Sequence, residues 1–240
     1  TAGTKVLDDV SLEIHEGEIL VIAGVQGNGQ TELTEAIIGM HGKTSGSISL
    51  DGQELIGKNV KQVLDLGVGF VPEDRTEDGL VAEFTIAENL MLDRSDRAPF
   101  AKGISLRLDF LREFAEQKRK EFDIRSQSID STASQLSGGN QQKVVLAREL
   151  SRELRLLVAS QPTRGLDVGS IEFVHEQIVA TRDKGIPVMI VATELDEATA
   201  LGDRIAVMYK GKIVGIVPAD TPREVLGQMM AGINVKEAAA

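Results

Sequence analysis

The 240-residue sequence contains no cysteine and no tryptophan, and it has one tyrosine and three histidines. Without cysteine, the chain can form neither a disulfide nor a thiolate zinc site. The histidines, His15, His41 and His175, are too scattered to predict a metal cluster. Apolar runs are short, such as Ile19–Ala23, far below the roughly 18 residues of a membrane span. These absences favour a cytosolic protein that reaches a membrane only through a partner.

Basic residues are also scarce relative to acidic ones. The 26 lysines and arginines stand against 37 aspartates and glutamates, which leaves a net charge of −11. Such a balance does not attract nucleic-acid phosphates, so we expect no nucleic-acid partner. Hydrophobic residues make up 42% of the chain, enough for the core of an α/β domain. Because Thr1 stands directly beside a strand-like segment, we expect a domain taken from a longer polypeptide.

Hydrophobic periodicity predicts alternating strands and helices. Residues 5–14 alternate loosely and predict an antiparallel strand, whereas the all-apolar run Ile19–Ala23 predicts a central parallel strand. The next helix has an apolar face made by Leu33, Ala36, Ile37 and Met40. Later strands are predicted at 47–50, 68–71, 154–159, 186–192, 205–209 and 212–217, and helices at 60–66, 171–182, 195–201 and 222–230. Residues 85–150 form a helical, charged insert, in which Leu108, Leu111, Phe114 and Ala115 share one face. The alternation predicts a mostly parallel sheet covered on both faces.

A glycine-rich turn separates the first apolar run from its helix. Residues 24–31 read Gly-Val-Gln-Gly-Asn-Gly-Gln-Thr, close to the phosphate-loop pattern of glycine, four residues, glycine, lysine, then serine or threonine. The lysine position holds Gln30, but backbone N–H groups and the helix dipole still favour phosphate, and the Thr31 hydroxyl can meet magnesium. The predicted nucleotide-binding residues are Gly24, Gln26, Gly27, Asn28, Gly29, Gln30, Thr31 and Glu32.

Two alternatives to a phosphate site stay open for this turn. Three glycines between a strand and a helix can serve tight packing alone. A dinucleotide-binding fold is the second alternative, but its fingerprint spaces the glycines as G-x-G-x-x-G and places an acidic residue about 20 residues further on. This sequence has neither the spacing nor an acidic residue ending a second strand there.

A second glycine motif occurs at residues 136–141, which read Leu-Ser-Gly-Gly-Asn-Gln and precede an apolar helical pattern. A serine and two glycines at the start of a helix present a hydroxyl and unpaired N–H groups, so they predict a second anion site. An ordinary helix cap is the alternative interpretation.

With these two motifs the sequence resembles the nucleotide-binding domain of ABC transporters, whose signature is Leu-Ser-Gly-Gly-Gln. The resemblance covers nearly the whole chain, including residues 71–75, 161–167 and 186–194. It implies an α/β, P-loop NTPase-type fold with a mostly parallel sheet, an antiparallel β edge and an α-helical insert. It also implies a core and β lobe at about 1–84 and 151–240 and a helical subdomain at about 85–150.

The resemblance further implies ATP and magnesium as cofactors and a paired arrangement of two domains. In that family the signature of one domain completes the ATP site of the other, and the aspartate at Asp167 lies between the domains. The residues that would act in trans here are Ser137, Gly138, Gly139, Asn140 and Gln141.

The charged or proton-handling positions of the family's own ATP site are altered in this chain, whereas the glycines, Thr31, residues 137–139 and Asp167 match the pattern. The family's Asp-Glu pair is replaced by Ser160 and Gln161, its switch histidine by Glu194, and the glutamine of the loop joining the lobes by Glu73. Neutral side chains at 160 and 161 cannot bind magnesium or assist a base as carboxylates do. With Gln30, these changes predict weak ATP binding and little or no hydrolysis at this chain's own loop, so none of these residues is assigned a catalytic role there. For Glu73, a solvated loop carboxylate is the alternative to a place near magnesium.

These motifs most resemble the second half of tandem ATPases that energise bacterial uptake of sugars or nucleosides. This implies a second nucleotide-binding domain upstream in the same polypeptide, transmembrane permease subunits, and indirectly a solute-binding protein, at the cytoplasmic face of the inner membrane. Phe84, Ile86, Leu90 and Met91 lie where the family docks its membrane subunit, although core packing explains them equally well. Two alternatives stay open: a nonhydrolytic module that senses nucleotide, and a soluble ABC protein acting in translation or DNA repair.

Overall fold

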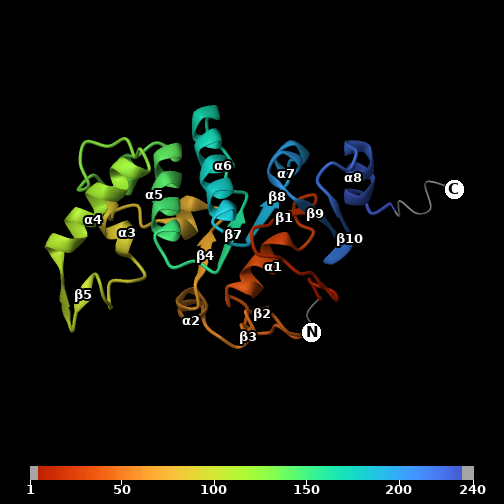
Figure 1. The fold of residues 1–240 in the computed structure, drawn as a ribbon, viewed down its shortest axis with the longest axis horizontal. Coiled ribbons are helices and arrows are strands. Elements are labelled where there is room, and N and C mark those ends of the chain that lie inside the picture. The colour runs from red at the N-terminus through yellow and green to blue at the C-terminus, as the bar shows by residue number, and fades with distance from the viewer. Residues whose placement is uncertain (1–4, 234–240) are drawn as a thin grey trace. The chain divides into compact units, whose positions relative to one another are not determined.

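A computed structural model describes residues 5–233 of the chain (Figure 1). The chain divides into two compact units. Within the described residues, unit 1 comprises 5–70, 154–161 and 177–233, and unit 2 comprises 71–153 and 162–176. The helical subdomain predicted at about 85–150 lies within unit 2, which also takes in 71–84 and 162–176.

Unit 1 is built on a six-stranded sheet with the strand order β10-β9-β1-β8-β7-β4. The strands are β1 (Ile19–Ala23), β4 (Val68–Val71), β7 (Leu156–Ser160), β8 (Val188–Ala192), β9 (Arg204–Tyr209) and β10 (Lys212–Pro218). β1 pairs in parallel with both β8 and β9, and β7 pairs in parallel with β8. β9 and β10 form an antiparallel hairpin at the edge of the sheet. The predicted mostly parallel sheet with an antiparallel edge is confirmed.

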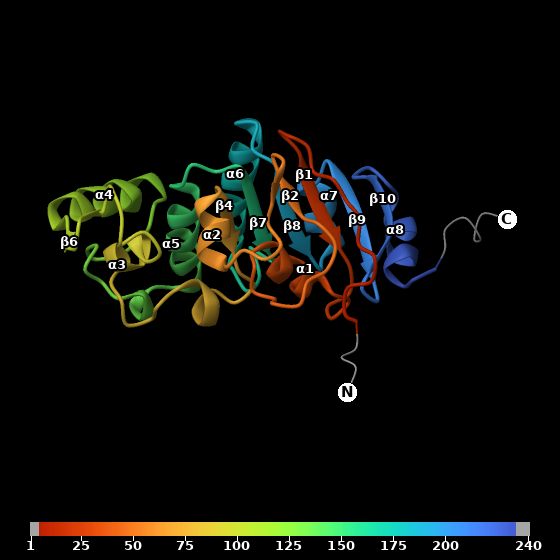
Figure 2. The ribbon, with the colours of Figure 1, turned by 90° about the horizontal axis from the view of Figure 1, so that it is seen from below.

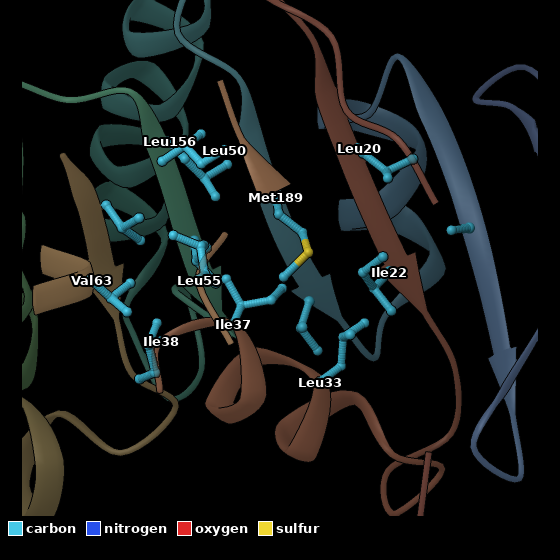
Figure 3. Packing of buried hydrophobic residues seen from close by; sticks show 14 of the residues in the cluster. Leu20, Ile22, Leu33, Ile37, Ile38, Leu50, Leu55, Val63, Leu156 and Met189 are labelled. Atoms are coloured by element: carbon cyan, nitrogen blue, oxygen red, sulfur yellow. The ribbon is translucent and has the colours of Figure 1, made fainter. Parts of the chain in front are cut away.

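The central strands are buried on both faces, as the continuous apolar runs predict. All five residues of β1 and of β8 are buried. Alternate residues of the strands pack against helix α1 (Gln30–Ile37), and Figure 3 shows Leu33 and Ile37 of α1 directed toward the strands that carry Ile22 and Met189. Helix α7 (Leu195–Leu201) lies on the opposite face of the sheet (Figure 2). The glycine turn follows β1 and therefore lies at one end of the buried sheet.

Shorter elements complete unit 1. β2 (Ser49–Leu50) and β3 (Gln53–Glu54) form an antiparallel pair around the predicted Asp51-Gly52 turn, in which both residues have positive φ. Helix α2 (Val60–Asp65) begins with a capping box between Asn59 and Gln62. Helix α8 (Arg223–Met230) follows the hairpin.

Unit 2 is mainly helical. Its elements are η1, a π-helical turn (Arg75–Gly79), α3 (Ile86–Met91), a two-stranded ribbon of β5 (Ala101–Lys102) and β6 (Ser105–Leu106), α4 (Leu108–Glu121), a 3₁₀ turn η2 (Ala133–Gln135), α5 (Gly138–Leu150) and the first part of α6 (Val168–Asp183). α5 packs against α3 and η1. The ribbon interrupts the predicted all-helical insert, because Gly103 with a positive φ reverses the chain there.

Three expectations drawn from periodicity are wrong. Residues 5–14 form no strand: Asp9 adopts a φ of 55°, which breaks the extended backbone. Four apolar residues of the segment still pack on the core: Leu7, Val10, Leu12 and Ile14. Met40 is 53% exposed because α1 ends at Ile37, before the left-handed Gly39. Leu108, the first residue of α4, is 61% exposed, whereas Leu111 and Ala115 of the same face are buried.

Candidate functional site

The first candidate site, in unit 1, is the turn between β1 and α1, which has the strand, glycine turn and helix order that a phosphate loop needs. Gly27 and Gly29 adopt φ values of 86° and 105°, which suit glycine. Gly29 precedes the first residue of α1, and its carbonyl accepts a hydrogen bond from the Leu33 N–H (2.9 Å). Thr31 and Glu32 lie in the first turn of α1. The turn therefore leads directly into the N-terminus of the eight-residue helix α1, where the helix dipole is positive.

Gln30, which replaces the lysine of the phosphate-loop pattern, turns its side chain into the loop. The side chain is only 3% exposed. Its Oε1 accepts a hydrogen bond from the Asn28 N–H (3.1 Å), and its Nε2 donates one to the Val25 carbonyl (3.1 Å). A Cβ at Gly24 would lie 2.5 Å from that Nε2, so only glycine leaves room for the glutamine. The amide thus binds the loop's own polar groups, including an N–H that a phosphate would otherwise take.

Asn28 fixes the same loop to the β9–β10 hairpin. Its Nδ2 donates to the Val25 carbonyl (2.8 Å), and its Oδ1 accepts a hydrogen bond from the Lys210 N–H (2.7 Å). The Gly211 N–H donates to the Asn28 carbonyl (2.8 Å). The sequence contained no signal for this contact, since the hairpin lies about 180 residues downstream. Val25 and Asn28 of the turn are therefore hydrogen-bonded to each other, to Gln30 and to the β9–β10 hairpin.

Ser160 and Gln161 stand where the sheet would present carboxylates. Ser160 ends β7 and shares the strand face of Leu156 and Val158, the face that α1 covers. It is 1% exposed, and its Oγ has no hydrogen-bond partner among the described residues. Gln161 has a φ of 44°, and its Oε1 accepts a hydrogen bond from the Thr193 hydroxyl (3.4 Å). These side chains can exchange hydrogen bonds but carry no charge.

Glu194 immediately precedes α7 and is exposed. It lines an open cavity of about 460 Å³ at that end of unit 1. The cavity is lined by Val25, Thr193, Glu194, Leu195, Asp196, Arg223, Gly227, Met230 and Ala231. Arg223 forms an ion pair with Asp196 across it. Glu194 and Val25 of the glycine loop therefore line the same cavity.

Magnesium usually binds through one or two carboxylates together with nucleotide phosphates. In unit 1 the Thr31 hydroxyl lies in the first turn of α1, but the side chains at 160 and 161 supply no carboxylate. Within residues 5–233, no three His, Cys, Asp or Glu side chains are grouped as metal ligands. The residues present fit a magnesium ion poorly.

The second candidate site, in unit 2, is the N-terminus of α5. Ser137 caps the helix: its Oγ accepts hydrogen bonds from the Asn140 side chain (2.9 Å) and the Asn140 N–H (3.4 Å). The Asn140 Oδ1 accepts a hydrogen bond from the Arg125 N–H (2.8 Å), and Gln141 Nε2 donates to the Ala133 carbonyl (3.0 Å). Side chains of the motif therefore hold its backbone in place, while Ser137 remains exposed.

The two glycines of this motif are tightly packed. A Cβ at Gly139 would lie 2.1 Å from the Ser170 Oγ and 3.2 Å from the Asp167 Oδ2. Asp167 caps the turn before α6 by accepting hydrogen bonds from the Ser170 N–H (3.0 Å) and hydroxyl (2.8 Å). These bonds, first that of the Ser170 hydroxyl, lower the pKa of the Asp167 carboxyl. Asp167 therefore stays ionised close to the α5 N-terminus.

The loop at 73–75, also in unit 2, contacts both the segment at 164 and the start of α5. Glu73 lies in this loop and is paired with Arg164. Arg75 donates a hydrogen bond from Nη1 to the Arg164 carbonyl (3.0 Å) and lies against Gly138. Arg75, Arg164 and Ser170 belong to this site but were not predicted as part of it, since no spacing rule links residues so far apart in the chain.

The helix predicted to dock a membrane subunit is largely internal. Ile86 and Leu90 are fully buried in unit 2, and Met91 is buried as well, so these three are core residues. Phe84 is 41% exposed. None of the helices in the described part of the chain combines the length and apolarity that a membrane crossing requires.

A family model described as ABC transporter matches residues 7–164. Curated relatives include the nucleoside import ATP-binding protein NupA of Lactococcus lactis, with 44% identity over 98% of this chain and 47% of the relative. The guanosine import ATP-binding protein NupO of Bacillus subtilis is 42% identical, over 99% and 47%. The glucose import ATP-binding protein TsgD13 of Haloferax volcanii is 43% identical, over 96% and 42%. The chain thus spans about half the length of these relatives.

Solved structures agree with the fold. A dimeric post-hydrolysis state of an ATP-binding cassette bound to ADP and Pi superimposes with a TM-score of 0.77, covering 92% of this chain and 95% of that one at 24% identity. A nucleotide-free ATP-binding cassette from an ABC transporter gives a TM-score of 0.73 over 91% and 87%, at 26% identity.

Proposed function

Since the chain belongs to the ABC transporter family, we propose that it is a nucleotide-binding domain of an importer for sugars or nucleosides. In this proposal it holds ATP weakly at its own loop. Its motif at 137–141 completes the ATP site of a second nucleotide-binding domain, where hydrolysis takes place. Sugars or nucleosides are supported as the cargo because the relatives are named as ATP-binding proteins for the import of nucleosides, guanosine or glucose.

The observation that carries the proposal is that the loop at 24–31 has lost its lysine, whereas the motif at 137–140 keeps the serine and both glycines of the signature. Gln30 fills the first loop with a neutral amide that binds the loop's own groups. The motif at 137–140 keeps its serine cap and both glycines at the start of a thirteen-residue helix. Such an N-terminus favours a phosphate brought to it. In this proposal the chain contributes more to the binding of ATP held by a second domain than to the binding of ATP at its own loop.

Weak binding at the first loop follows from the missing lysine contact. A hydrogen bond between charged groups is worth about 1.5–3 kcal/mol, or roughly 10- to 150-fold in affinity. The glycine backbone and the α1 dipole remain, so some affinity is expected to persist. Magnesium would have to be held by the nucleotide phosphates and Thr31 without a carboxylate from β7.

Negligible hydrolysis at the first loop follows from Ser160 and Gln161. A positioned general base contributes about 10²–10⁴-fold to a rate, and neither side chain titrates. The buried Ser160 hydroxyl has no partner that would activate it among the described residues. Phosphoryl transfer depends on positioning and electrostatic stabilisation, so losing metal ligand and base together removes most of the catalytic power.

The proposed assembly contains this chain, a second nucleotide-binding domain in the same polypeptide, transmembrane permease subunits and, indirectly, a solute-binding protein. In it the chain lies at the cytoplasmic face of the cell membrane. The lengths of the relatives, about twice that of the chain, support a second domain. The net charge of −11 supports a function without nucleic acid.

The proposal is tested on the polypeptide that carries both domains, reconstituted with its permease. Ser137→Ala is expected to lower ATPase activity and uptake at least 10²-fold, the usual cost of losing a donor to developing charge. Gln161→Ala is the matched control and is expected to leave turnover unchanged. Normal uptake in Ser137→Ala, or magnesium-dependent turnover that Gln161→Ala abolishes, would contradict the proposal. ATP-dependent association of the two domains without turnover would instead favour a nucleotide-sensing module.

A further inference from the structure

The β5–β6 ribbon of unit 2 carries an exposed apolar group. Ten large hydrophobic residues are exposed in the described part of the chain. Three of them, Ile104, Leu106 and Leu108, fall within five consecutive positions, whereas the other seven are scattered singly along the sequence. Single exposed hydrophobic residues are normal in soluble proteins, but a contiguous group marks an interaction site. The ribbon therefore differs from the rest of the described surface.

Ile104 lies at the tip of this ribbon. Gly103 and Ile104 join the two strands, and Gly103 has a φ of 64°. A positive φ at the first central residue alone is typical of a type II′ turn, which requires glycine at that position and not at the next. Ile104 is fully exposed, with a relative accessibility of 105%. Neither the turn nor the core therefore requires an isoleucine at this position.

The base of the ribbon is anchored in unit 2. Phe100, which precedes β5, is buried and packs edge-on against Phe110 and Phe114 of α4, with ring centroids 5.5 and 5.1 Å away. The Arg107 N–H donates to the Phe100 carbonyl (2.8 Å), and the Arg107 guanidinium lies over the Phe110 ring at 5.2 Å. Figure 1 shows the ribbon projecting beyond α3 and α4. Because the tip is already held in place, a partner would have little chain to order on binding.

Two cations flank the tip. Lys102 precedes the turn, Arg107 follows β6, and both are exposed. The only acidic residue in the stretch 101–109 is Asp109, so this stretch is net positive in a chain whose net charge is −11. Apolar side chains with lysine or arginine beside them bind the interface of an anionic membrane, where the apolar groups enter the head-group region and the cations meet lipid phosphates. The charge of the ribbon is therefore complementary to an anionic bilayer.

We propose that the β5–β6 ribbon contacts the lipid bilayer directly, with Ile104 inserted among the head groups of anionic phospholipids and with Lys102 and Arg107 against their phosphates. This inference rests on the proposed function for the nearness of a membrane, and it adds a lipid contact to the attachment through the permease. A bilayer fits a convex tip because it accepts an apolar side chain without a complementary pocket.

A contact of this size is expected to strengthen an existing attachment rather than to recruit the protein alone. Membrane binding scales with the apolar area that is buried and with the number of cations, and the ribbon offers little of either. When the permease already holds the protein, the second contact becomes intramolecular and its effect is multiplied into the overall affinity. The tests therefore use the assembled protein.

The first test locates residue 104 in the two-domain protein, assembled on its permease in vesicles of phosphatidylethanolamine and phosphatidylglycerol. The 240-residue chain contains no cysteine. Ile104→Cys therefore gives a single site for a polarity-sensitive fluorophore, once any cysteine of the other domain and of the permease has been replaced. Spin-labelled lipid is expected to quench this fluorophore. Met40→Cys is the control, since Met40 is an apolar residue of unit 1 that is 53% exposed, and no quenching is expected there.

Two results of this test overturn the inference. A fluorophore at 104 with a blue-shifted spectrum but no quenching by spin-labelled lipid would lie in a protein pocket. A fluorophore with the spectrum of a water-exposed dye would have no partner at all.

The second test measures the affinity of the two-domain protein for permease-containing vesicles. Ile104→Ser is expected to lower it roughly tenfold, the effect of one isoleucine side chain no longer removed from water, whereas Met40→Ser leaves it unchanged. Lys102→Gln is expected to lower it about fivefold, and this loss should disappear in phosphatidylcholine vesicles. Lys184→Gln is the matched control, because Lys184 is an exposed lysine of unit 1.

The outcomes separate this inference from the proposed function. If the two-domain protein does not bind the permease-containing vesicles, the proposed function fails. If it binds, but Ile104→Ser has no effect or Lys102→Gln costs as much in phosphatidylcholine as in phosphatidylglycerol vesicles, only the lipid contact of the ribbon is overturned.

Discussion

In the loop at 24–30, the side chain after the last glycine turns inward and hydrogen-bonds its own backbone. In the loop at 137–140, the serine before the first glycine remains exposed, and a guanidinium lies beside the helix with one nitrogen unpaired among the described residues. Both loops lie between an irregular segment or strand and a helix N-terminus, and both depend on glycine. They differ in the side chain beside the glycines: Gln30 is buried within its loop, whereas Ser137 is exposed and caps its helix.

This difference shows why glycines alone do not define a working nucleotide site. Glycine gives the backbone the positive φ and close approach that a cradle requires. The neighbouring side chains then decide whether the cradle is open. Gln30 supplies an acceptor for the Asn28 N–H and a donor to the Val25 carbonyl, so these two groups of the first loop are paired within the protein. In the second loop the Ser137 hydroxyl accepts hydrogen bonds from Asn140, and the buried Arg75 Nε has no hydrogen-bond partner among the described residues.

The largest effect is expected at Gly139. A Cβ there would lie 2.1 Å from the Ser170 Oγ and must push apart the cap of α6 and the start of α5. We expect Gly139→Ala to lower the ATPase rate of the two-domain protein at least 10²-fold, equivalent to about 2.7–4 kcal/mol. Steady-state ATPase assays measure this directly.

Gly169→Ala provides the matched control in the same loop region. Its Cβ would meet the Asp167 Oδ1 at 3.6 Å, an ordinary contact. Activity close to wild type is expected. Equal losses in the two variants would show that the region is merely intolerant of alanine, and the comparison between the loops would lose its steric basis.

A smaller effect is expected at Gln30, and it concerns stability rather than turnover. Gln30→Ala leaves the Asn28 N–H without its acceptor, and it removes the bond to the Val25 carbonyl. A hydrogen bond contributes about 0.5–1.5 kcal/mol net, and water can reach the partly exposed Asn28 and the exposed Val25, so the free energy of unfolding of unit 1 should fall by about 1 kcal/mol. Urea denaturation of the protein followed by circular dichroism measures it.

Gln53→Ala is the control, since Gln53 is an exposed residue of β3. Its effect is expected to stay within about 0.5 kcal/mol. Gln30→Glu keeps an acceptor for Asn28 but loses the donor to Val25, so an intermediate loss is expected. If Gln30→Ala unfolds at the same urea concentration as the wild type, the glutamine is not part of the loop's framework.

Local patterns predicted most of the fold. The runs at 19–23 and 188–192 are apolar throughout and lie in the middle of the sheet, and the two-residue turn at Lys210-Gly211 joins the predicted hairpin. Prediction failed where a single backbone torsion outweighed the pattern. Asp9, with a φ of 55°, breaks a segment that alternates well enough to be a strand.

The candidate sites, like the fold, were predicted only in part from local sequence patterns. Sequence patterns located both glycine motifs and the neutral residues Ser160 and Gln161. They did not predict the inward turn of Gln30 or the approach of Arg75 to Gly138, because both depend on side-chain packing between segments. The contact of Arg75 with Gly138 joins residues 63 positions apart and follows no periodicity. Contacts of this kind determine which polar groups of a glycine motif remain accessible.

The smallest expected effect concerns pH, and it separates the loops by their chemistry. Residues 24–30 contain no titratable side chain, whereas Asp167 lies beside Gly139 with a pKa lowered by the Ser170 hydroxyl and N–H. Because the folded pKa is depressed, the stabilisation of this turn is fully present above the ordinary aspartate pKa of about 3.9 and is lost as the pH falls through the lower folded value. Carboxyl ¹³C NMR titration should therefore give a pKa below about 3.9 for Asp167, and Ser170→Ala should raise it toward that value. An unchanged pKa in Ser170→Ala would mean that the Asp167–Ser170 bonds do not stabilise the charged form in solution.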